Sequence, residues 1–278
     1  MKIIIFGSNG MLGRYVTTYL KMNHDIIPID RNQYDVLKST FDDLDIFLKK
    51  LLSNSDDETI IINCIGIIPQ RTQTNEPEKF LYINSVFPHL LNSFAKKNLC
   101  KLIHITTDCV FDGRKGNYNE NDEHTEKNIY GVSKSLGEPL TATVIRTSII
   151  GEELENKKSL LEWVKKQDNS NIFGYDNHFW NGVTCLQLSK IIAIIINNKL
   201  YWTGVRHIYS PISVSKYELI NLICDIYGLH ITLNHHHTIN LCDKTLSTIY
   251  DTNSYFNIPG LREQIIEQKK YSINYLKY

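Results

Sequence analysis

Three side chains have the types and spacing needed to protonate a carbonyl oxygen during its reduction. Tyr130 and Lys134 are four residues apart, so a helix would place them on one face, and Thr107 follows a strand-like run. A free phenol has a pKa of about 10 and is a poor acid near neutrality. An ammonium about 4 Å away, at an effective dielectric of about 20, supplies roughly the 4 kcal/mol that lowers it to about 7. We predict Tyr130 as general acid, Lys134 as its pKa-lowering partner and Thr107 as donor to the oxyanion. An incidental Tyr-x-x-x-Lys on a surface helix is the alternative.

A glycine-rich segment near the N-terminus stands between a strand-like and a helix-like run. Gly7, Gly10 and Gly13 are three residues apart. In such a turn the first glycine allows the bend, the second admits a pyrophosphate, and the third lets the helix pack on the strand. The helix N-terminus adds free N–H groups and partial positive charge, so we predict dinucleotide binding rather than simple turn punctuation. The predicted loop consists of Gly7, Ser8, Asn9, Gly10, Met11, Leu12 and Gly13.

Two residues after the second strand-like run bear on the choice of dinucleotide. Asp30 could accept hydrogen bonds from the ribose hydroxyls of NAD(H), whereas Arg31 could pair with the 2′-phosphate of NADP(H). The two residues favour opposite cofactors, so both cofactors stay open. Lys134 could in addition hold the nicotinamide ribose.

The elements that position these residues are visible as alternating apolar runs and amphipathic segments. The expected strands are 2–6, 25–29, 59–64, 101–106 and 142–146, and the expected helices are 11–22, 39–52, 79–98 and 130–138. Near-continuous aliphatic strands such as 60–62 indicate burial on both faces, which is typical of a parallel sheet flanked by helices. The alternation predicts an α/β fold with a doubly wound parallel sheet of the Rossmann type.

The pattern loosens after Gly151. Later expected elements are helices 159–166, 185–197 and 215–227 and a strand at 205–209. We expect residues 1–150, with 183–210, to form the dinucleotide-binding domain. Residues 151–182 and 211–278 are expected to form a smaller substrate-binding lobe over the carboxyl edge of the sheet.

Composition argues against several classes of protein. The 278-residue chain has Lys+Arg 30 and Asp+Glu 30, so no net field favours nucleic acid or an anionic membrane. Residues 1–6 reach glycine too soon for a signal peptide, and the longest aliphatic run, 191–196, is far below the ~20 residues that span a bilayer. The six scattered cysteines fit free thiols in the reducing cytoplasm. The histidines at 235–237 have no acidic or cysteine partner at ligand spacing, so we expect no metal site.

These motifs resemble the extended short-chain dehydrogenase/reductases, and within them the dTDP-4-dehydrorhamnose reductase family. The likeness covers nearly the whole chain, through the glycine loop and segments 61–66, 83–85, 104–113, 130–138 and 146–151. It implies reduction of the 4-keto group of a nucleotide-activated 6-deoxy sugar with NADPH or NADH. It also implies cofactor contacts from Cys64 and Gly66 and from Asp35 near the adenine, although Asp35 could equally be a turn residue. The regulatory subunit of methionine adenosyltransferase is similar too, and it binds NADP without a known reductase task.

Finer features are similar to one branch, the reductases of UDP-2-acetamido-2,6-dideoxy-hexos-4-uloses. They lie in segments 63–70, 112–118, 159–163 and 181–184. Cys109 replaces the tyrosine usual in the rhamnose pattern and resembles the cysteine of GDP-fucose synthase and of bifunctional rhamnose epimerase/reductases. There it shuttles a proton beside the keto group, a task that suits a thiol tuned toward neutrality. The histidine or lysine that assists it there is replaced by Trp163, so Cys109 as a packing residue is the alternative to 3-epimerisation.

The resemblance also places side chains beside a nucleotide-sugar substrate. They are Asp108, Cys109, His178, Trp180, Asn181, Lys244 and Ser247. Residues that merely fill the lobe are the alternative for His178 and those after it. Enzymes of this family are often homodimers, but no oligomer seam can be identified in this sequence. The nucleotide base, the C2 substituent and the product stereochemistry also stay open.

Overall fold

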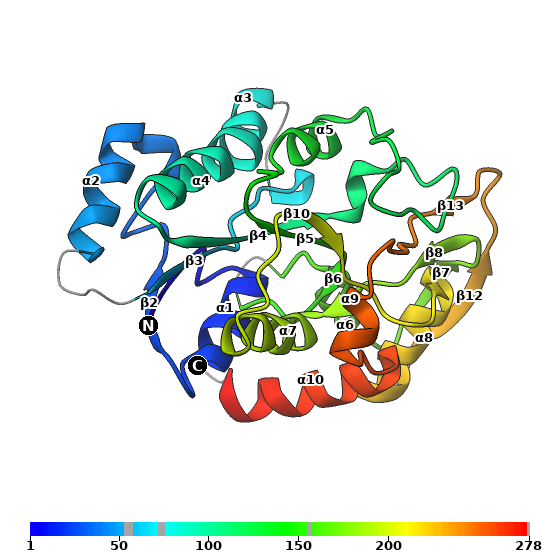
Figure 1. Cartoon of the computed structure of the whole chain (residues 1–278). Coiled ribbons are helices and arrows are strands. Elements are labelled where there is room, and N and C mark those ends of the chain that lie inside the picture. The colour runs from blue at the N-terminus through cyan, green and yellow to red at the C-terminus, as the bar shows by residue number, and fades with distance from the viewer. Residues whose placement is uncertain (53–57, 72–75, 155–156, 277–278) are drawn as a thin grey trace.

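A parallel six-stranded sheet forms the centre of the protein (Figure 1). The computed structural model describes residues 1–52, 58–71, 76–154 and 157–276. The strand order is β10-β5-β4-β3-β1-β2, which confirms the predicted α/β fold. The strands are β1 (Lys2–Phe6), β2 (Asp25–Ile29), β3 (Thr59–Asn63), β4 (Lys101–Thr107), β5 (Thr143–Thr147) and β10 (Gly204–His207).

Burial on both faces explains why these aliphatic runs become central strands. Along β1, Ile3 and Ile5 pack into one core cluster, and Ile4 and Phe6 pack into another on the opposite face. All of these side chains are fully buried. Because successive side chains of a strand alternate between faces, an apolar residue at every position requires helices on both sides.

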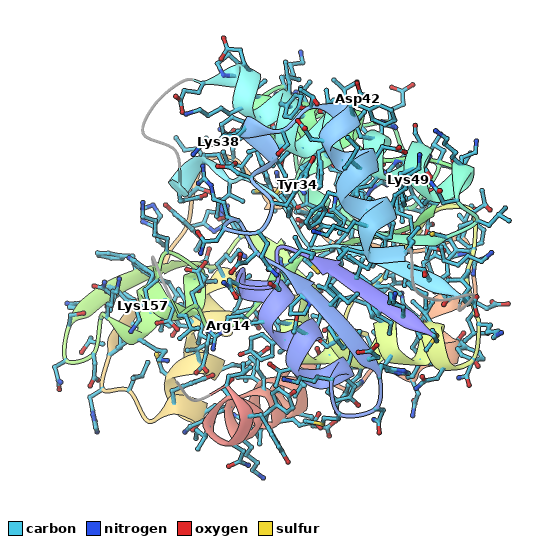
Figure 2. All side chains as sticks on the ribbon, turned by 90° about the vertical axis from the view of Figure 1, so that its left-hand side faces the viewer. Arg14, Tyr34, Lys38, Asp42, Lys49 and Lys157 are labelled. Atoms are coloured by element: carbon cyan, nitrogen blue, oxygen red, sulfur yellow. The ribbon has the colours of Figure 1, made fainter. Side chains whose placement is uncertain are left out.

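Helices cover the two faces as separate layers (Figure 1). One layer contains α1 (Met11–Leu20), α7 (Cys185–Asn197) and α10 (Leu261–Tyr275), and the other contains α2 (Phe41–Leu52), α4 (Phe87–Lys97) and α5 (Ile129–Leu136). Figure 2 shows Arg14 on the side of α1, and Tyr34, Asp42 and Lys49 on the side of α2. Among the described residues, no helix is long and apolar enough to cross a membrane.

The expected helix at 79–98 forms, but it contains a π-helical turn. It consists of α3 (Pro77–Leu81), a π-helical turn η3 (Tyr82–Val86) and α4. The π turn brings the Asn84 carbonyl so close to α5 that a Cβ on Gly137 would lie 1.8 Å from it. Asn84 Nδ2 donates to Ser133 Oγ at 3.1 Å, so this turn fixes the position of α5.

Elements from the second half of the chain form a smaller lobe beside the carboxyl edge of the sheet (Figure 1). β7 (Asn171–Tyr175) pairs with β12 (Thr232–His236), and β8 (His178–Trp180) lies between β11 (Val214–Ser215) and β13 (Cys242–Asp243). Their apolar side chains pack with α6 (Leu160–Lys165) and α8 (Lys216–Tyr227) in a third core cluster. The shorter elements are η1 (Val36–Lys38), η2 (Pro69–Arg71), η4 (Asp108–Val110), β6 (Ile149–Ile150), β9 (Val183–Thr184) and α9 (Thr252–Phe256).

Candidate active site

Two adjoining cavities open along the carboxyl edge of the sheet. The inner cavity, about 580 Å³, contains most of the predicted catalytic and loop residues in its wall: Gly7, Gly10, Met11, Leu12, Cys64, Gly66, Thr107, Asp108, Cys109, Tyr130 and Lys134. The outer cavity, about 790 Å³, has Asn9, Asp30, Arg31 and Asp35 in its wall. The glycine loop borders both cavities, so together they form one groove.

The glycine loop has the geometry that the spacing predicts. Gly7 has a φ of +77°, a conformation that favours glycine. A Cβ on Gly13 would lie 2.0 Å from the Gly7 carbonyl oxygen, so only glycine permits this contact between α1 and the loop. Gly7 and the buried Ser8 donate their N–H groups to Ile29 at the end of β2. The loop therefore directs the N-terminus of α1, with N–H groups that have no partner within the helix, at the groove.

The residues predicted to recognise a ribose lie in the wall of the outer cavity. Asp30 accepts hydrogen bonds from the Asn32 and Gln33 N–H groups and from Asn9 Nδ2, so its carboxylate is held in place. Arg31 is exposed and its Nε lies 3.2 Å from Asp35 Oδ2. Asp35 also accepts from the Leu37 N–H group, which makes it both a cavity residue and a turn residue.

Helix α5 brings Tyr130 and Lys134 to the inner cavity. The helix begins after Asn128, whose Oδ1 accepts from the Gly131 N–H at 2.9 Å. Lys134 is 6% exposed, and its ammonium lies so close to Gly66 that a Cβ there would be 2.8 Å from Nζ. Burial lowers the pKa of Lys134 to about 8, against the opposing charge of Glu138. This ammonium makes no hydrogen bond or ion pair with any described residue.

The expected lowering of the Tyr130 pKa is not found in this structure. Burial raises the pKa of Tyr130, the neighbouring Cys109 adds to the rise, and hydrogen bonding with Thr107 offsets only part of it. Lys134 is not among the groups that shift this pKa. Its ammonium lies beside Gly66 and interacts with Glu138, so its charge acts elsewhere.

Thr107, Asp108 and Cys109 form a turn at the end of β4. Thr107 Oγ1 donates to Asp108 Oδ1 at 3.0 Å and accepts from the Cys109 N–H at 3.1 Å. The Thr107 hydroxyl must therefore turn away from Asp108 before it can donate to an oxyanion. Burial, followed by the charge of Asp108, raises the pKa of Cys109 to about 12, opposite to the tuning expected for a proton-removing thiolate.

Two lysines of the lobe act on this turn, and the sequence analysis identified only one of them. Burial raises the pKa of Asp108, and Lys216 and Lys244 oppose part of that rise. Lys244 is also paired with Glu126 at 3.3 Å. The Lys216 ammonium lies 5.2 Å from the centre of the Trp180 ring and makes no hydrogen bond or ion pair with a described residue. Lys216 is the first residue of α8, where the helix dipole disfavours a cation, and this misplaced charge was a signal available in the sequence.

The other predicted substrate residues are not all in the groove. Trp180 and Lys216 line a small cavity of about 80 Å³ that shares Ser148 and Leu160 with the inner cavity. Asn181 is buried and makes two hydrogen bonds with the Leu246 backbone, at 2.8 and 2.9 Å, which is a packing role. The hydroxyl of Ser247 donates to the Asn117 carbonyl at 2.9 Å.

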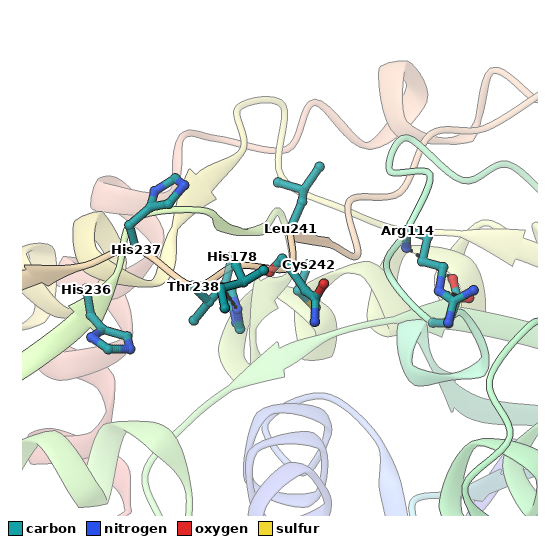
Figure 3. Close-up of a pocket in the computed structure, with 10 residues that line it drawn as sticks. Arg114, His178, His236, His237, Thr238, Leu241 and Cys242 are labelled. Atoms are coloured by element: carbon teal, nitrogen blue, oxygen red, sulfur yellow. Dashed lines mark hydrogen bonds and ion pairs between the residues drawn. The ribbon is translucent and has the colours of Figure 1, made fainter.

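His178 lies in a separate, open cavity of about 950 Å³, whose wall also contains Arg114, His236, His237 and Cys242 (Figure 3). Its Nε2 is 3.1 Å from Thr238 Oγ1. None of the three predicted catalytic residues lines this cavity.

The histidine run at 235–237 closes β12 and continues past it. It does have an acidic neighbour, because Asp176 lies 3.5 Å from His235 Nδ1 and 2.8 Å from His237 Nδ1. This carboxylate lies 61 residues from His237 along the chain, so no local pattern in the sequence predicts it. The described residues contain no group of three or more side chains arranged to hold a metal ion.

Arg146 is the centre of a buried cluster of polar side chains next to the C-terminal end of α5. The guanidinium is 2% exposed and donates to both carboxylate oxygens of Glu138, at 3.0 and 2.6 Å. It also contacts the ring nitrogens of His207 at 2.8 Å and His124 at 2.6 Å, and it lies over the Phe111 ring. The cluster joins β5, the end of α5 and β10.

Comparison with known proteins assigns the chain to a family. Residues 1–240 match the family described as the RmlD substrate binding domain. The chain belongs to this family.

Proteins similar to this chain carry different names. The chain is 27% identical over 238 residues to dTDP-4-dehydrorhamnose reductase of Aggregatibacter actinomycetemcomitans, a match that covers 81% of this chain and 78% of the relative. It is 25% identical over 245 residues to methionine adenosyltransferase 2 subunit beta of Danio rerio, covering 82% and 74%. A solved dTDP-4-dehydrorhamnose reductase of Bacillus anthracis, in complex with NADP, has the same fold, with a TM-score of 0.80, 20% identity and coverage of 98% and 99%.

Proposed function

We propose that this protein is an NAD(P)H-dependent reductase of the 4-keto group of a nucleotide-linked 6-deoxy sugar. The observation that carries the proposal is that Thr107, Tyr130 and Lys134 line one cavity that opens onto the glycine loop. The dTDP-4-dehydrorhamnose reductase named above supports the same reaction class. We also propose the division into a dinucleotide-binding domain and a substrate lobe that the sequence suggested.

The residues of the groove fit a dinucleotide. Gly7 and Gly10 line both cavities at the N-terminus of α1, where a pyrophosphate would bind, and Asp30 and Arg31 lie in the outer cavity for the adenosine ribose. When bound, NAD(P)H supplies a hydride to the carbonyl carbon. Tyr130 then gives its hydroxyl proton to the oxygen, Thr107 donates a hydrogen bond to the same oxygen, and Lys134 holds the nicotinamide ribose.

For the substrate we propose a UDP-2-acetamido-2,6-dideoxy-hexos-4-ulose, with a dTDP-linked 4-keto-6-deoxy sugar as the alternative. Lys216 and Lys244 next to Asp108 offer the positive charge that the diphosphate of either substrate requires. We propose 3-epimerisation through Cys109 only as an accompanying activity. Because burial keeps the Cys109 thiol protonated, its role would be to return a proton to the carbon beside the keto group after a solvent base has removed the original one, and solvent would then reprotonate the thiolate.

The proposal is tested by offering the protein 4-keto sugars made from UDP-N-acetylglucosamine and from dTDP-glucose and following NAD(P)H oxidation. The faster substrate identifies the nucleotide and the C2 substituent. In heavy water, deuterium at C3 would report proton exchange at Cys109, and no label above background would end the epimerase proposal.

Tyr130→Phe separates a reductase from a binding subunit. We expect kcat to fall by roughly 10² to 10⁴ because the general acid is lost, while NAD(P)H affinity is kept. The matched control is Tyr255→Phe, since Tyr255 is an exposed tyrosine of α9 outside the inner cavity. A wild-type protein that binds NADPH but turns over neither sugar would instead support a regulatory subunit like that of methionine adenosyltransferase.

A further inference from the structure

Lys158 occupies a position in the groove that the proposed reaction does not explain. The inner and outer cavities share five lining residues among those described: Gly7, Gly10, Ile65, Gly66 and Lys158. Lys158 is the only one of these with a charged side chain. It lies where the two cavities meet, at the glycine loop.

The Lys158 side chain crosses the groove. Its ammonium donates to the backbone carbonyl of Gln70 at 2.6 Å. Lys158 belongs to the segment before α6 in the lobe, whereas Gln70 belongs to η2, which follows β3 of the central sheet. The contact therefore joins the two walls of the groove.

The backbone of Lys158 is fixed, although its side chain ends on a single neutral acceptor. The buried Glu153 carboxylate accepts from the N–H groups of Lys158 and Ser159, at 2.6 and 2.9 Å. Ser159 in turn caps the N-terminus of α6 and donates to the Gly151 carbonyl at 3.1 Å. A rigid base with a four-carbon stem lets the ammonium change partner without any backbone movement.

The other cations of the outer cavity have carboxylate partners. Arg31 pairs with Asp35 at 3.2 Å, and Lys79 pairs with Glu76 at 2.6 Å. Lys158 alone among these cations is held by a carbonyl. A phosphate oxygen, which carries negative charge, is a stronger hydrogen-bond acceptor for an ammonium than a neutral carbonyl is.

A dinucleotide needs such a charge at this point. Its pyrophosphate carries two negative charges, and the N-terminus of a helix such as α1 supplies only about half a positive charge. We infer that Lys158 is a pyrophosphate latch: it exchanges the Gln70 carbonyl for a phosphate oxygen when a dinucleotide binds and holds the ligand against the glycine loop. The inference rests on the proposed function, because it requires a dinucleotide in this groove.

The test compares two neighbouring lysines and two ligands by titration calorimetry on the full chain. The variants are Lys158→Gln, Lys158→Arg and, as matched control, Lys157→Gln, which removes the same charge one residue away. The ligands are NADPH, which contains the pyrophosphate, and adenosine 2′-monophosphate, which lacks it. Thermal melting of each variant checks that it is folded.

We expect Lys158→Gln to weaken NADPH binding by roughly tenfold or more, and to change adenosine 2′-monophosphate binding by less than about twofold. Lys158→Arg keeps the charge and should restore NADPH affinity to within about threefold of wild type, and Lys157→Gln should leave both affinities unchanged. Equal NADPH affinity in Lys158→Gln and Lys157→Gln would overturn the latch. An equal loss of affinity for NADPH and for adenosine 2′-monophosphate in Lys158→Gln would overturn it too. Wild-type protein that binds no dinucleotide would overturn the proposed function itself.

Discussion

Two buried cations near α5 differ in how their charges are satisfied. Arg146 makes hydrogen bonds with Glu138, His124 and His207 and lies over an aromatic ring. Lys134 is almost as deeply buried but has no hydrogen bond or ion pair among the described residues, and burial lowers its pKa to about 8. Both interact with the same carboxylate, that of Glu138.

The difference separates a structural charge from a functional one. Removing a charge from water costs several kcal/mol, and a complete set of hydrogen bonds offsets that cost. Arg146 has such a set, so it can fasten β5 to the end of α5. The desolvation of the Lys134 ammonium is not offset by hydrogen bonds, which is typical of a residue whose partner is a bound ligand. The folding contribution of Lys134 should therefore be small or negative, and its contribution to activity large.

Lys134→Met should show the largest effect of these variants on turnover. We expect kcat to fall by about 10² or more, because the cation that we propose to hold the nicotinamide ribose in the inner cavity is lost. The free energy of unfolding in urea should stay the same or rise, since a buried ammonium without hydrogen bonds is removed. Lys127→Met, at an exposed lysine before α5, is the control. A loss of several kcal/mol in Lys134→Met would show that this ammonium is structural after all.

Arg146→Met should affect stability, in contrast to Lys134→Met, which should affect turnover. It leaves Glu138 buried without its partner, so we expect the free energy of unfolding to fall by about 3–5 kcal/mol. The double variant Arg146→Met with Glu138→Leu should recover part of this loss, because no uncompensated charge remains. Urea denaturation of the single and double variants measures the loss of stability and its partial recovery. If the single variant is as stable as wild type, the distinction between the two cations is lost.

The sequence predicted what depends on local spacing. The glycine loop and the four-residue interval from Tyr130 to Lys134 are periodic features of single elements, and the structure brings them to one groove. The expected strands closely follow the observed ones, because fully apolar runs have few alternatives to a central parallel sheet. The roles of the individual site residues stay predictions.

The sequence did not reveal partners that are distant along the chain. His124 and His207 reach Arg146 from 22 and 61 residues away, and Asp176 reaches His237 from 61 residues away. No local pattern encodes such pairs. The direction of a pKa shift could not be predicted from the sequence either, because it depends on burial. The pKa values of Tyr130 and Cys109 are both raised, whereas their proposed roles require lowered values.

The Arg146 cluster predicts a smaller effect, a loss of stability in acid. Burial, followed by the charge of Arg146, lowers the pKa of His207 to about 4, below about 6.5 for an unfolded histidine. Between these values the unfolded chain binds a proton that the folded chain does not. The stabilisation from neutral His207 is therefore complete above about pH 6.5 and is lost as the pH falls toward 4, by up to about 3 kcal/mol.

His207→Gln removes this titration while keeping a hydrogen-bond acceptor for Arg146. Between pH 6.5 and 4 the free energy of unfolding should fall less in the variant than in wild type. The slopes of the two pH profiles should differ by the equivalent of up to one proton taken up on unfolding. The control is His230→Gln, at an exposed histidine of the lobe. Parallel pH profiles of wild type and His207→Gln would mean that His207 is not held neutral against Arg146. The cluster would then lose one of its acceptors, and the contrast with Lys134 would rest on the two remaining partners of Arg146, Glu138 and His124.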